Sequence, residues 1–579
     1  MAQAQLDTRI LLTLTPPRVC FGGNLQACMP NPPEGSSHFD RFDALALLAF
    51  TLVAFVLRFY SPIQPNFLTH PFSSSPITDC VTSTPIDPKG DLGTLCGLAY
   101  PFQQGSKSGN TYSPSNGQVF DEVYFPADAY HDFKGLLECT STTVGCPDNY
   151  FDPEPPLGKT FIGLGELAYG WYQATFTSAH GSYIDLGYNT FGWRLAACLF
   201  GILLVPLFYL LARRLWRPRF FAIATATLVC FDGMFFIQSR IGMIDIFAIF
   251  FIVLIYYLFL VHLQSRSARS SILSLAGLGL ALGLGIATKW IVLAAASVVF
   301  FLLFLELLRG WWPFLDRHLW PRLMHGRFPG GASGWLYLPL AFVNLTLLPV
   351  LIYVVSWLPF FLRGQFHTIS DLIQYNRDAF HYHATLVATH PFSSPWWSWP
   401  FLSRPVYYYA CCNQGQLGFD SWTHSALYAQ MYDIGNPWIW WTALPCLLAL
   451  PFFIFFRRSF PATLIALGFI TQWLPWSQVT RVVFLYHMFA SAIFTILALA
   501  FVLTWIYEHR GRLGRAFAIS HLAIAIMAFA YFYPIWTALP ISGAALYPSP
   551  DSPPWGAKSW LAACTPNVTP AKAQLWCWP

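Results

Sequence analysis

The stretch "GWRLAACLFGILLVPLFYLLARRL", residues 192–215, decides the class of fold. It contains an apolar run of about 20 residues, which is long enough to cross a hydrocarbon core roughly 30 Å thick. Runs of this kind recur along the 579 residues, of which 55% are hydrophobic and 10% are charged. Soluble domains carry roughly 25% charged residues. The sequence therefore predicts a polytopic membrane protein.

We expect eleven transmembrane helices in this chain. Their approximate ranges are 42–61, 192–214, 220–237, 244–263, 271–287, 290–308, 339–361, 438–456, 459–475, 482–506 and 516–535. Residues 1–41 are polar and contain prolines. We therefore expect no short cleavable signal there, and we expect the first apolar run to be a membrane anchor.

Basic residues indicate which ends of these spans face the cytoplasm. They follow every second span, at 213–219, 266–269, 309–327, 457–458 and 508–515. The positive-inside rule places these loops, and with them the N-terminus, in the cytoplasm. An odd number of spans leaves the C-terminus outside. The net charge of +5 is explained better by these loops than by nucleic-acid binding.

Three parts of the chain are then external: about 62–191, about 362–437 and the tail. We divide the chain into a cytoplasmic tail (1–41), a transmembrane domain (42–540) and an external tail (541–579). Eight cysteines fall outside, namely Cys80, Cys96, Cys139, Cys146, Cys411, Cys412, Cys564 and Cys577. An even number in an oxidising compartment favours structural disulfides over a metal site, since paired CxxC spacing is missing.

Glycines recur in "LAGLGLALGLGIATKW", residues 275–290. They lie inside an apolar span without a preceding strand, so a phosphate-binding loop is disfavoured. We expect them to allow close packing between helices.

Charged residues gather at the external ends of the predicted helices. Asp121 and Glu122 stand side by side in "GQVFDEVYFPADAY", residues 117–130, within the first external loop. The other external charges of interest are Glu154, Lys159, Arg240, Asp245, Lys289, Arg404 and Arg481. Ionisable groups at membrane depth are costly, and they are functional or paired by default.

Each of these residues also has a structural interpretation. Arg240 and Arg481 could extend from the membrane to the interface. Asp245 could simply pair with Arg240, and Lys159 could anchor the start of a helix. Asp121 and Glu122 could form a solvated loop pair. The gathering of several cations and acids on one membrane face favours a functional site.

This combination of residues suits chemistry at an anionic lipid head group. Cations at helix ends can bind a phosphate and stabilise it as a leaving group. A nearby carboxylate can act as a general base on an acceptor hydroxyl. The pattern therefore indicates glycosyl transfer from a polyprenyl phosphate sugar.

Several motifs resemble one known family. They are the Asp121-Glu122 pair, "EPPLGK" (154–159), the stretch quoted first, "FDGMFFIQSRIGMIDIFAIFF" (231–251), "GLALGLGIATKW" (279–290), "HYHATLVATHPFSSPWWSWPFLSRPVYYY" (381–409), "GNPWIWW" (435–441) and "WLPWSQVTRVVFLYH" (473–487). In this order they resemble the protein O-mannosyltransferases, membrane enzymes of the GT-C class that use polyprenyl or dolichyl phosphate mannose. The resemblance covers roughly residues 42–540.

The resemblance implies an all-α polytopic fold with short interfacial helices in the first external loop. It implies that Asp121 is the catalytic base, with Glu122 beside it as a positioning residue, in an inverting displacement. It implies that Arg240 contacts the lipid phosphate. The remaining residues assigned to the phosphate or sugar are Lys159, Lys289, Arg404, Arg481, Asp245 and Glu154. No metal and no cofactor are expected.

The implied partners are polyprenyl-phosphate-mannose, membrane lipid, and proteins with Ser or Thr that are being secreted, but no nucleic acid. Glu154 replaces a histidine of the family motif, and the soluble lumenal domain of the eukaryotic enzymes is missing. This favours a prokaryotic plasma membrane. Two alternatives stay open: a transferase for another lipid-linked sugar, such as aminoarabinose, and a lipid-sugar transporter. A transporter predicts charges at the bilayer midplane and symmetric halves.

Overall fold

The computed structural model describes most of the predicted transmembrane domain. The described residues are 39–59, 119–135, 153–309, 312–321, 334–388, 390, 392–410, 416–419, 426–428, 430–539, 541–546, 558–560 and 577–578. The stretch near 70–118 lies outside these ranges, as do all the predicted external cysteines except Cys577. Cys577 is disulfide-bonded, as expected for this set, and the external location of these cysteines stays a prediction.

Helices occupy all the ranges predicted to span the membrane. They are α1 (Arg41–Arg58), α7 (Thr190–Leu215), α8 (Arg219–Cys230), α9 (Gly233–Gln238), α10 (Asp245–Leu263), α11 (Ala268–Thr288), α12 (Val292–Leu308), α14 (Gly334–Phe342), η4 (Val343–Leu347), α15 (Leu348–Ser356), α18 (Pro437–Arg457), α19 (Phe460–Trp473), α20 (Phe489–His509) and α21 (Gly511–Thr537). Among the described residues, seven helical stretches are long and apolar enough to cross a membrane, and α8 and α12 are shorter apolar helices. The membrane fold is confirmed, whereas the number of spans stays a prediction.

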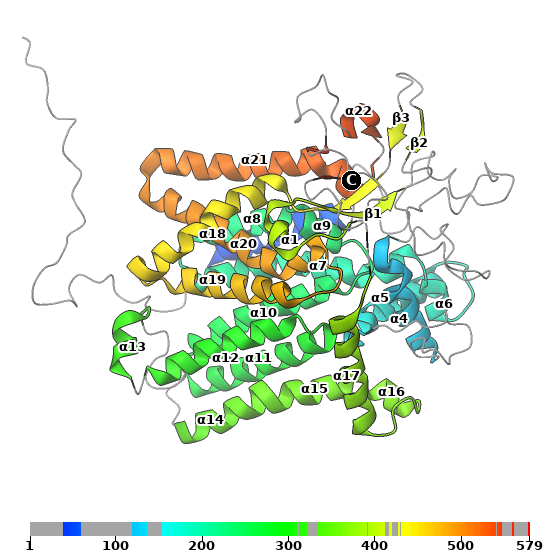
Figure 1. The fold of residues 1–579 in the computed structure, drawn as a ribbon, viewed down its shortest axis with the longest axis horizontal. Helices are drawn as coiled ribbons and strands as arrows, with labels where there is room; N and C mark the ends of the chain where they lie inside the picture. The colour runs from blue at the N-terminus through cyan, green and yellow to red at the C-terminus, as the bar shows by residue number, and fades with distance from the viewer. Residues whose placement is uncertain are drawn as a thin grey trace, which may run out of the picture.

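The two ends of the helical bundle differ in structure (Figure 1). The short helix α13 (Pro313–His318) lies at one end. The opposite end carries α4 (Phe125–Lys134), α5 (Leu157–Phe176), α6 (Tyr183–Gly187), α16 (Leu358–Leu362) and α17 (Ile369–Thr385). Segments predicted to lie outside therefore gather at one end of the molecule. Which end faces the cytoplasm stays a prediction.

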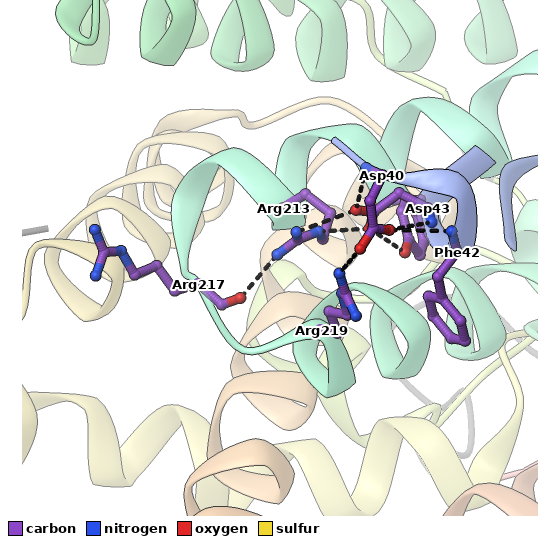
Figure 2. Close-up of polar contacts among 7 residues, drawn as sticks. Asp40, Phe42, Asp43, Arg213, Arg217 and Arg219 are labelled. Carbon is purple, nitrogen blue, oxygen red and sulfur yellow. Dashed lines mark hydrogen bonds and ion pairs between the residues drawn. The ribbon is translucent and has the colours of Figure 1, made fainter. Parts of the chain in front are cut away.

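The N-terminus of α1 is tied to the turn between α7 and α8 (Figure 2). The buried carboxylate of Asp43 accepts from Arg213 Nε at 2.8 Å and from Tyr209 Oη at 2.7 Å. Asp40 caps α1 by accepting from the N–H groups of Phe42 and Asp43, and it also pairs with Arg219. Satisfying the orphan donors at a helix start in this way stabilises the first turn. The contacts hold the first helix in register with the rest of the bundle.

The predicted close packing of α11 is confirmed. A Cβ atom on Gly279 would lie 1.9 Å from the carbonyl oxygen of Asn344. A Cβ atom on Gly283 would lie 2.8 Å from Ile352 Cβ. Any side chain at these two positions would therefore push α11 away from η4 and α15. Lipid supplies no hydrophobic force between transmembrane helices. Small residues instead let the two backbones approach closely and pack together.

Short strands, which the sequence did not predict, occur in and after the second large external segment. They are β1 (Val406–Ala410), β2 (Gln416–Phe419), β3 (Ala426–Tyr428), β4 (Gln430–Asp433) and β5 (Ile541–Ser542). β1 pairs antiparallel with β4, and β2, β3 and β5 form a second sheet. The β1–β4 register shifts between Tyr407 and Tyr409, so Tyr408 is the extra residue of a β-bulge.

The predicted first external loop contains a long helix that hydropathy did not predict as a separate element. α5 packs against α4, α6 and α7, and it is not among the helices apolar enough to cross a membrane. Its Glu166 is fully buried, and neither carboxylate oxygen has a hydrogen-bond partner in the described ranges. Burial raises the pKa of Glu166 well above its usual value. The folded protein therefore keeps the proton on this carboxyl to a higher pH than the unfolded chain does.

We predict that Glu166→Gln makes thermal stability less dependent on pH. The wild-type folded state keeps a proton that the unfolded chain loses above a pKa of about 4.3. Stability therefore falls as pH rises from there toward the raised pKa of the folded state. Glutamine keeps the neutral form at every pH. The melting temperature in detergent, measured between pH 5 and 9, should fall less steeply in the variant and be higher than wild type at the alkaline end. Parallel curves would contradict a protonated Glu166.

Candidate active site

Glu122 is fixed by four hydrogen bonds in the protein interior. Its carboxylate accepts from Arg194 Nε at 2.6 Å and from Arg194 Nη2 at 2.5 Å. It also accepts from the backbone N–H of Gly242 at 2.6 Å and from that of Val119 at 2.7 Å. Both charged side chains are fully buried. Such a carboxylate has its acceptor sites occupied, so its geometry suits a brace for the loop better than a base for a substrate.

Asp121 has a different environment from its neighbour. It lies in η2 (Phe120–Val123), a short 3₁₀ helix, and it is partly exposed. Glu122, which is the buried brace, follows Asp121 directly in the chain. Adjacent residues point in different directions, so the Asp121 carboxylate can face a substrate while Glu122 faces the interior. This division between the two acids agrees with the predicted roles, which themselves stay predictions.

The residue before Asp121 is held by aromatic rings. Phe120 has a φ of +49°, a left-handed conformation that costs a non-glycine residue roughly 1–2 kcal/mol. Its ring stacks on that of Tyr408 with centroids 4.4 Å apart, and it meets the edge of the Tyr486 ring at 5.8 Å. Aromatic pairs of this kind contribute about 0.5–1.5 kcal/mol each beyond burial. The two contacts can therefore offset the strain in the backbone beside Asp121.

Lys289 forms the centre of a charge cluster. It pairs with Asp245 at 2.9 Å and with Glu154 at 3.6 Å. These two carboxylates raise the pKa of Lys289, although burial opposes them as the largest single effect. The ion-pair partner of Asp245 is thus Lys289 rather than Arg240, which corrects the pairing considered from sequence. The second oxygen of Asp245, Oδ2, is buried and accepts no hydrogen bond within the described residues.

Tyr486 connects this cluster with Asp121. The charges of Asp121, Asp245, Glu154 and Arg481 all act on its phenol group. Arg481 also acts on Lys289. The structure therefore pairs Glu154, Asp245 and Lys289 directly, and Asp121 and Arg481 lie within electrostatic range of Tyr486.

Arg240 lies in a second group of arginines. Its side chain is 2% exposed and covers the Phe236 ring at 4.7 Å. Arg58 and Arg194 both act electrostatically on it, and burial lowers the pKa of Arg240 to about 10. A buried guanidinium of this kind does not extend to the interface, so that structural interpretation was wrong for Arg240. Its predicted contact with the lipid phosphate stays a prediction.

Lys159 and Arg404 occupy other positions. Lys159 is buried in α5 and lies 3.6 Å from Asp128 of α4, which makes it a link between these two helices. Arg404 lies between η5 (Trp396–Phe401) and β1, is 5% exposed, and acts on His390. The roles assigned to both residues in substrate binding stay predictions.

Sequence reasoning missed Arg194, Tyr408 and Tyr486. Arg194 stands in the first quoted stretch, where it marks the start of a helix, and its partner Glu122 is 72 residues away. Both tyrosines occur in motifs that were quoted for the resemblance, "SRPVYYY" and "VVFLYH".

No group of three or more potential metal ligands gathers within the part of the chain that the structure describes.

A helical membrane fold with acids and cations gathered at one end agrees with a membrane-embedded glycosyltransferase of the GT-C type. Residues 148–362 match the family described as dolichyl-phosphate-mannose-protein mannosyltransferase. Residues 368–548 match the C-terminal four-transmembrane region of protein O-mannosyltransferase. Together the two matches cover more than half of the chain, which therefore belongs to the protein O-mannosyltransferase family.

Individual relatives agree with this assignment. A polyprenol-phosphate-mannose–protein mannosyltransferase from Mycobacterium tuberculosis is 28% identical over 545 residues, covering 81% of this chain and 94% of the relative. The protein of the same name from Corynebacterium glutamicum is 24% identical over 481 residues, covering 73% of this chain and 85% of its own. The fold is similar to that of the Saccharomyces cerevisiae protein O-mannosyltransferase Pmt1-Pmt2 complex bound to the sugar donor, with a TM-score of 0.58, 14% identity and coverage of 86% of this chain and 90% of that chain.

We predict that Glu122→Gln destabilises the protein, whereas Asp121→Asn does not. Removing the charge of Glu122 leaves Arg194 buried without its counter-ion, and breaking a buried pair costs about 3–5 kcal/mol. Asp121 is partly exposed, and asparagine keeps its shape. Melting temperatures of the two variants in the same detergent should therefore differ clearly, with Asp121→Asn close to wild type. Equal melting temperatures would contradict the role of Glu122 as a brace.

Proposed function

We propose that this enzyme transfers a mannosyl residue from polyprenyl-phosphate-mannose to Ser or Thr hydroxyls of proteins at the external membrane face. The observation that carries the proposal is the position of Tyr486: its ring contacts Phe120, the neighbour of Asp121, and its phenol lies in the electrostatic range of Asp121 and of Asp245 and Glu154, the two partners of Lys289. A carboxylate next to cations is what transfer from a lipid phosphate requires. The relatives from Mycobacterium tuberculosis and Corynebacterium glutamicum carry this activity in their names.

The proposed reaction is a direct displacement at the anomeric carbon. Asp121 takes the proton of the acceptor hydroxyl as its oxygen bonds to that carbon. The bond between the carbon and the phosphate oxygen breaks, and polyprenyl phosphate leaves with the electron pair. The sugar is transferred with inversion, and Asp121 then releases its proton to water. General bases of this kind contribute roughly 10²–10⁴-fold to rate.

Lys289 and Arg481 are the proposed partners of the leaving phosphate. Lys289 has two carboxylates around it, and these hold the ammonium group in place before the donor arrives. The unpartnered Oδ2 of Asp245 is a suitable acceptor for a sugar hydroxyl. In this arrangement the cations stabilise the charge that develops as the glycosidic bond breaks. The acids next to Lys289 orient the sugar.

The proposed location is a prokaryotic plasma membrane, with the N-terminus in the cytoplasm and the site outside. The basic loops support this orientation through the positive-inside rule. The proposed acceptors are proteins in the course of secretion, since these expose unfolded Ser- and Thr-containing segments at that face. Cysteines introduced into the predicted loops and labelled from each side test the orientation.

The activity can be tested with purified protein in lipid nanodiscs. The chain should move labelled mannose from polyprenyl-phosphate-mannose to a Ser/Thr peptide. Polyprenyl phosphate carrying aminoarabinose, offered with a glycolipid acceptor, tests the alternative transferase. Movement of the donor between leaflets without transfer would indicate a transporter. A parallel reaction with a chelator tests whether a divalent metal is needed, and we expect activity to persist.

We predict that Asp121→Asn lowers turnover by about 10²-fold or more at saturating donor, because asparagine cannot accept the proton. Donor affinity should remain close to wild type. The initial rate of mannosyl transfer and donor binding are measured on the same preparation. Near-normal turnover would mean that another group is the base.

We predict that Lys289→Met weakens donor use by about tenfold or more in KM. Methionine has a similar length but no charge for the phosphate, and it also leaves Asp245 and Glu154 without their cation. Lys289→Arg should be partly active. The matched control is Lys134→Met, which removes the cation of a half-exposed external pair with Asp185 and should leave the donor KM unchanged. An unchanged KM in Lys289→Met would remove this residue from the phosphate site.

A further inference from the structure

Tyr408 is placed by an irregularity in the β1–β4 pair. Val406 and Tyr407 pair with Asp433 and Tyr432, and the register then shifts before Tyr409 pairs with Met431. A bulge turns the extra side chain in a new direction, and bulges are frequent next to active sites. The ring of Tyr408 is 1% exposed and stacks on Phe120, the residue directly before Asp121. The bulge therefore directs Tyr408 toward η2, the 3₁₀ helix that contains Asp121.

The hydroxyl of Tyr408 is anchored on its other side. It accepts from Gln238 Nε2 at 2.7 Å and donates to Asp433 Oδ2 at 3.2 Å. Gln238 Nε2 also lies 3.4 Å from Asp433 Oδ2, and all three side chains are buried. Burial raises the pKa of Asp433 to about 8, with Asp232 and Asp245 adding to the rise. The anchor thus holds the Tyr408 hydroxyl through two buried partners.

The stack between Tyr408 and Phe120 involves a residue, Phe120, whose backbone is strained. Phe120 keeps a left-handed φ that phenylalanine rarely adopts, and its ring lies against both Tyr408 and Tyr486. Relaxation of that φ would rotate the chain at the point where Asp121 begins. Strained residues persist where their surroundings hold them, and they are found at functional sites.

We propose that Tyr408, anchored by Gln238 and Asp433, is a positioning residue that holds the Asp121 carboxylate in line with the acceptor hydroxyl through its stack on Phe120. This inference rests on the proposed function, since it concerns the same base. Tyr408 touches neither substrate nor phosphate in this scheme. It acts on the rate of the chemical step and not on donor binding.

The first test is Tyr408→Phe, which keeps the ring and removes the anchored hydroxyl. We expect turnover to fall about tenfold with the donor KM unchanged. Tyr408→Leu removes the stack as well and should lower turnover by about 10²-fold, the scale of a 1 Å misplacement of a reacting group. The control is Tyr256→Phe on α10, whose buried hydroxyl has no hydrogen-bond partner in the described structure, and which should match wild type.

A second pair of variants, at Asp433, separates the anchoring of the Tyr408 hydroxyl from the charge of the Asp433 carboxyl. Asp433→Asn keeps the shape and an oxygen that accepts from Tyr408, so activity should be retained. Asp433→Leu keeps the volume and loses the acceptor, so it should show the loss of Tyr408→Phe. Melting temperatures identify any variant that fails to fold. If one of the Tyr408 variants fails to fold, the Asp433 pair decides the result, and if one of the Asp433 variants fails, the Tyr408 pair does.

The decisive measurement is Tyr408→Phe in the background of Asp121→Asn. A residue that acts through the base adds no further loss once the base is absent. An equal loss in both backgrounds, an unchanged turnover in Tyr408→Phe, or an effect confined to KM would each overturn the proposal. If wild type transfers no mannose, the proposed function fails. If wild type is active and Asp121→Asn is not, a silent Tyr408→Phe refutes only this inference.

Discussion

The Glu122–Arg194 pair is the interaction on which the arrangement of the site depends. Removing two charges from water costs several kcal/mol per ion, and only good geometry with additional hydrogen bonds repays it. Here the guanidinium binds both carboxylate oxygens, and two backbone N–H groups complete the set. The pair joins the predicted first external loop to the start of α7 and to the turn before α10. Three segments far apart in the sequence are thereby held at one point, and Asp121 is next to it.

The membrane fold could be predicted from sequence because the bilayer imposes a length and a composition on every span. The predicted ranges accordingly fall on helices. The resemblance implied short helices in this loop, but hydropathy did not locate α5, since its glycines, aromatic residues and Glu166 form no apolar run. The strands were also missed. "VYYYA" is short, and what makes it a strand is its pairing with a segment about twenty residues later.

The candidate site was predicted only in part. Residue types and sidedness were enough to select Glu154, Asp245 and Lys289, which the structure pairs, and Asp121 and Arg481, whose charges act on the same tyrosine as those of Glu154 and Asp245. Pairing was not predictable, because a charge near one partner in sequence can meet another in space. Asp245 is close to Arg240 in the chain and yet binds Lys289. Tyrosine residues were missed because an uncharged aromatic in a chain with 18% aromatic residues carries no distinctive signal.

The β1–β4 pair has a consequence for how the family can vary. Residues 411–429 connect the two strands. Because β1 pairs with β4, the two ends of this connection are held side by side before the chain continues into α18. Lengthening a connection whose ends are already paired costs little, since closure entropy grows only slowly with length. The stretches that link β1 to β2, β2 to β3 and β3 to β4 can therefore be lengthened at small cost without moving the bulge, whereas β3 itself is held by its pairing with β5.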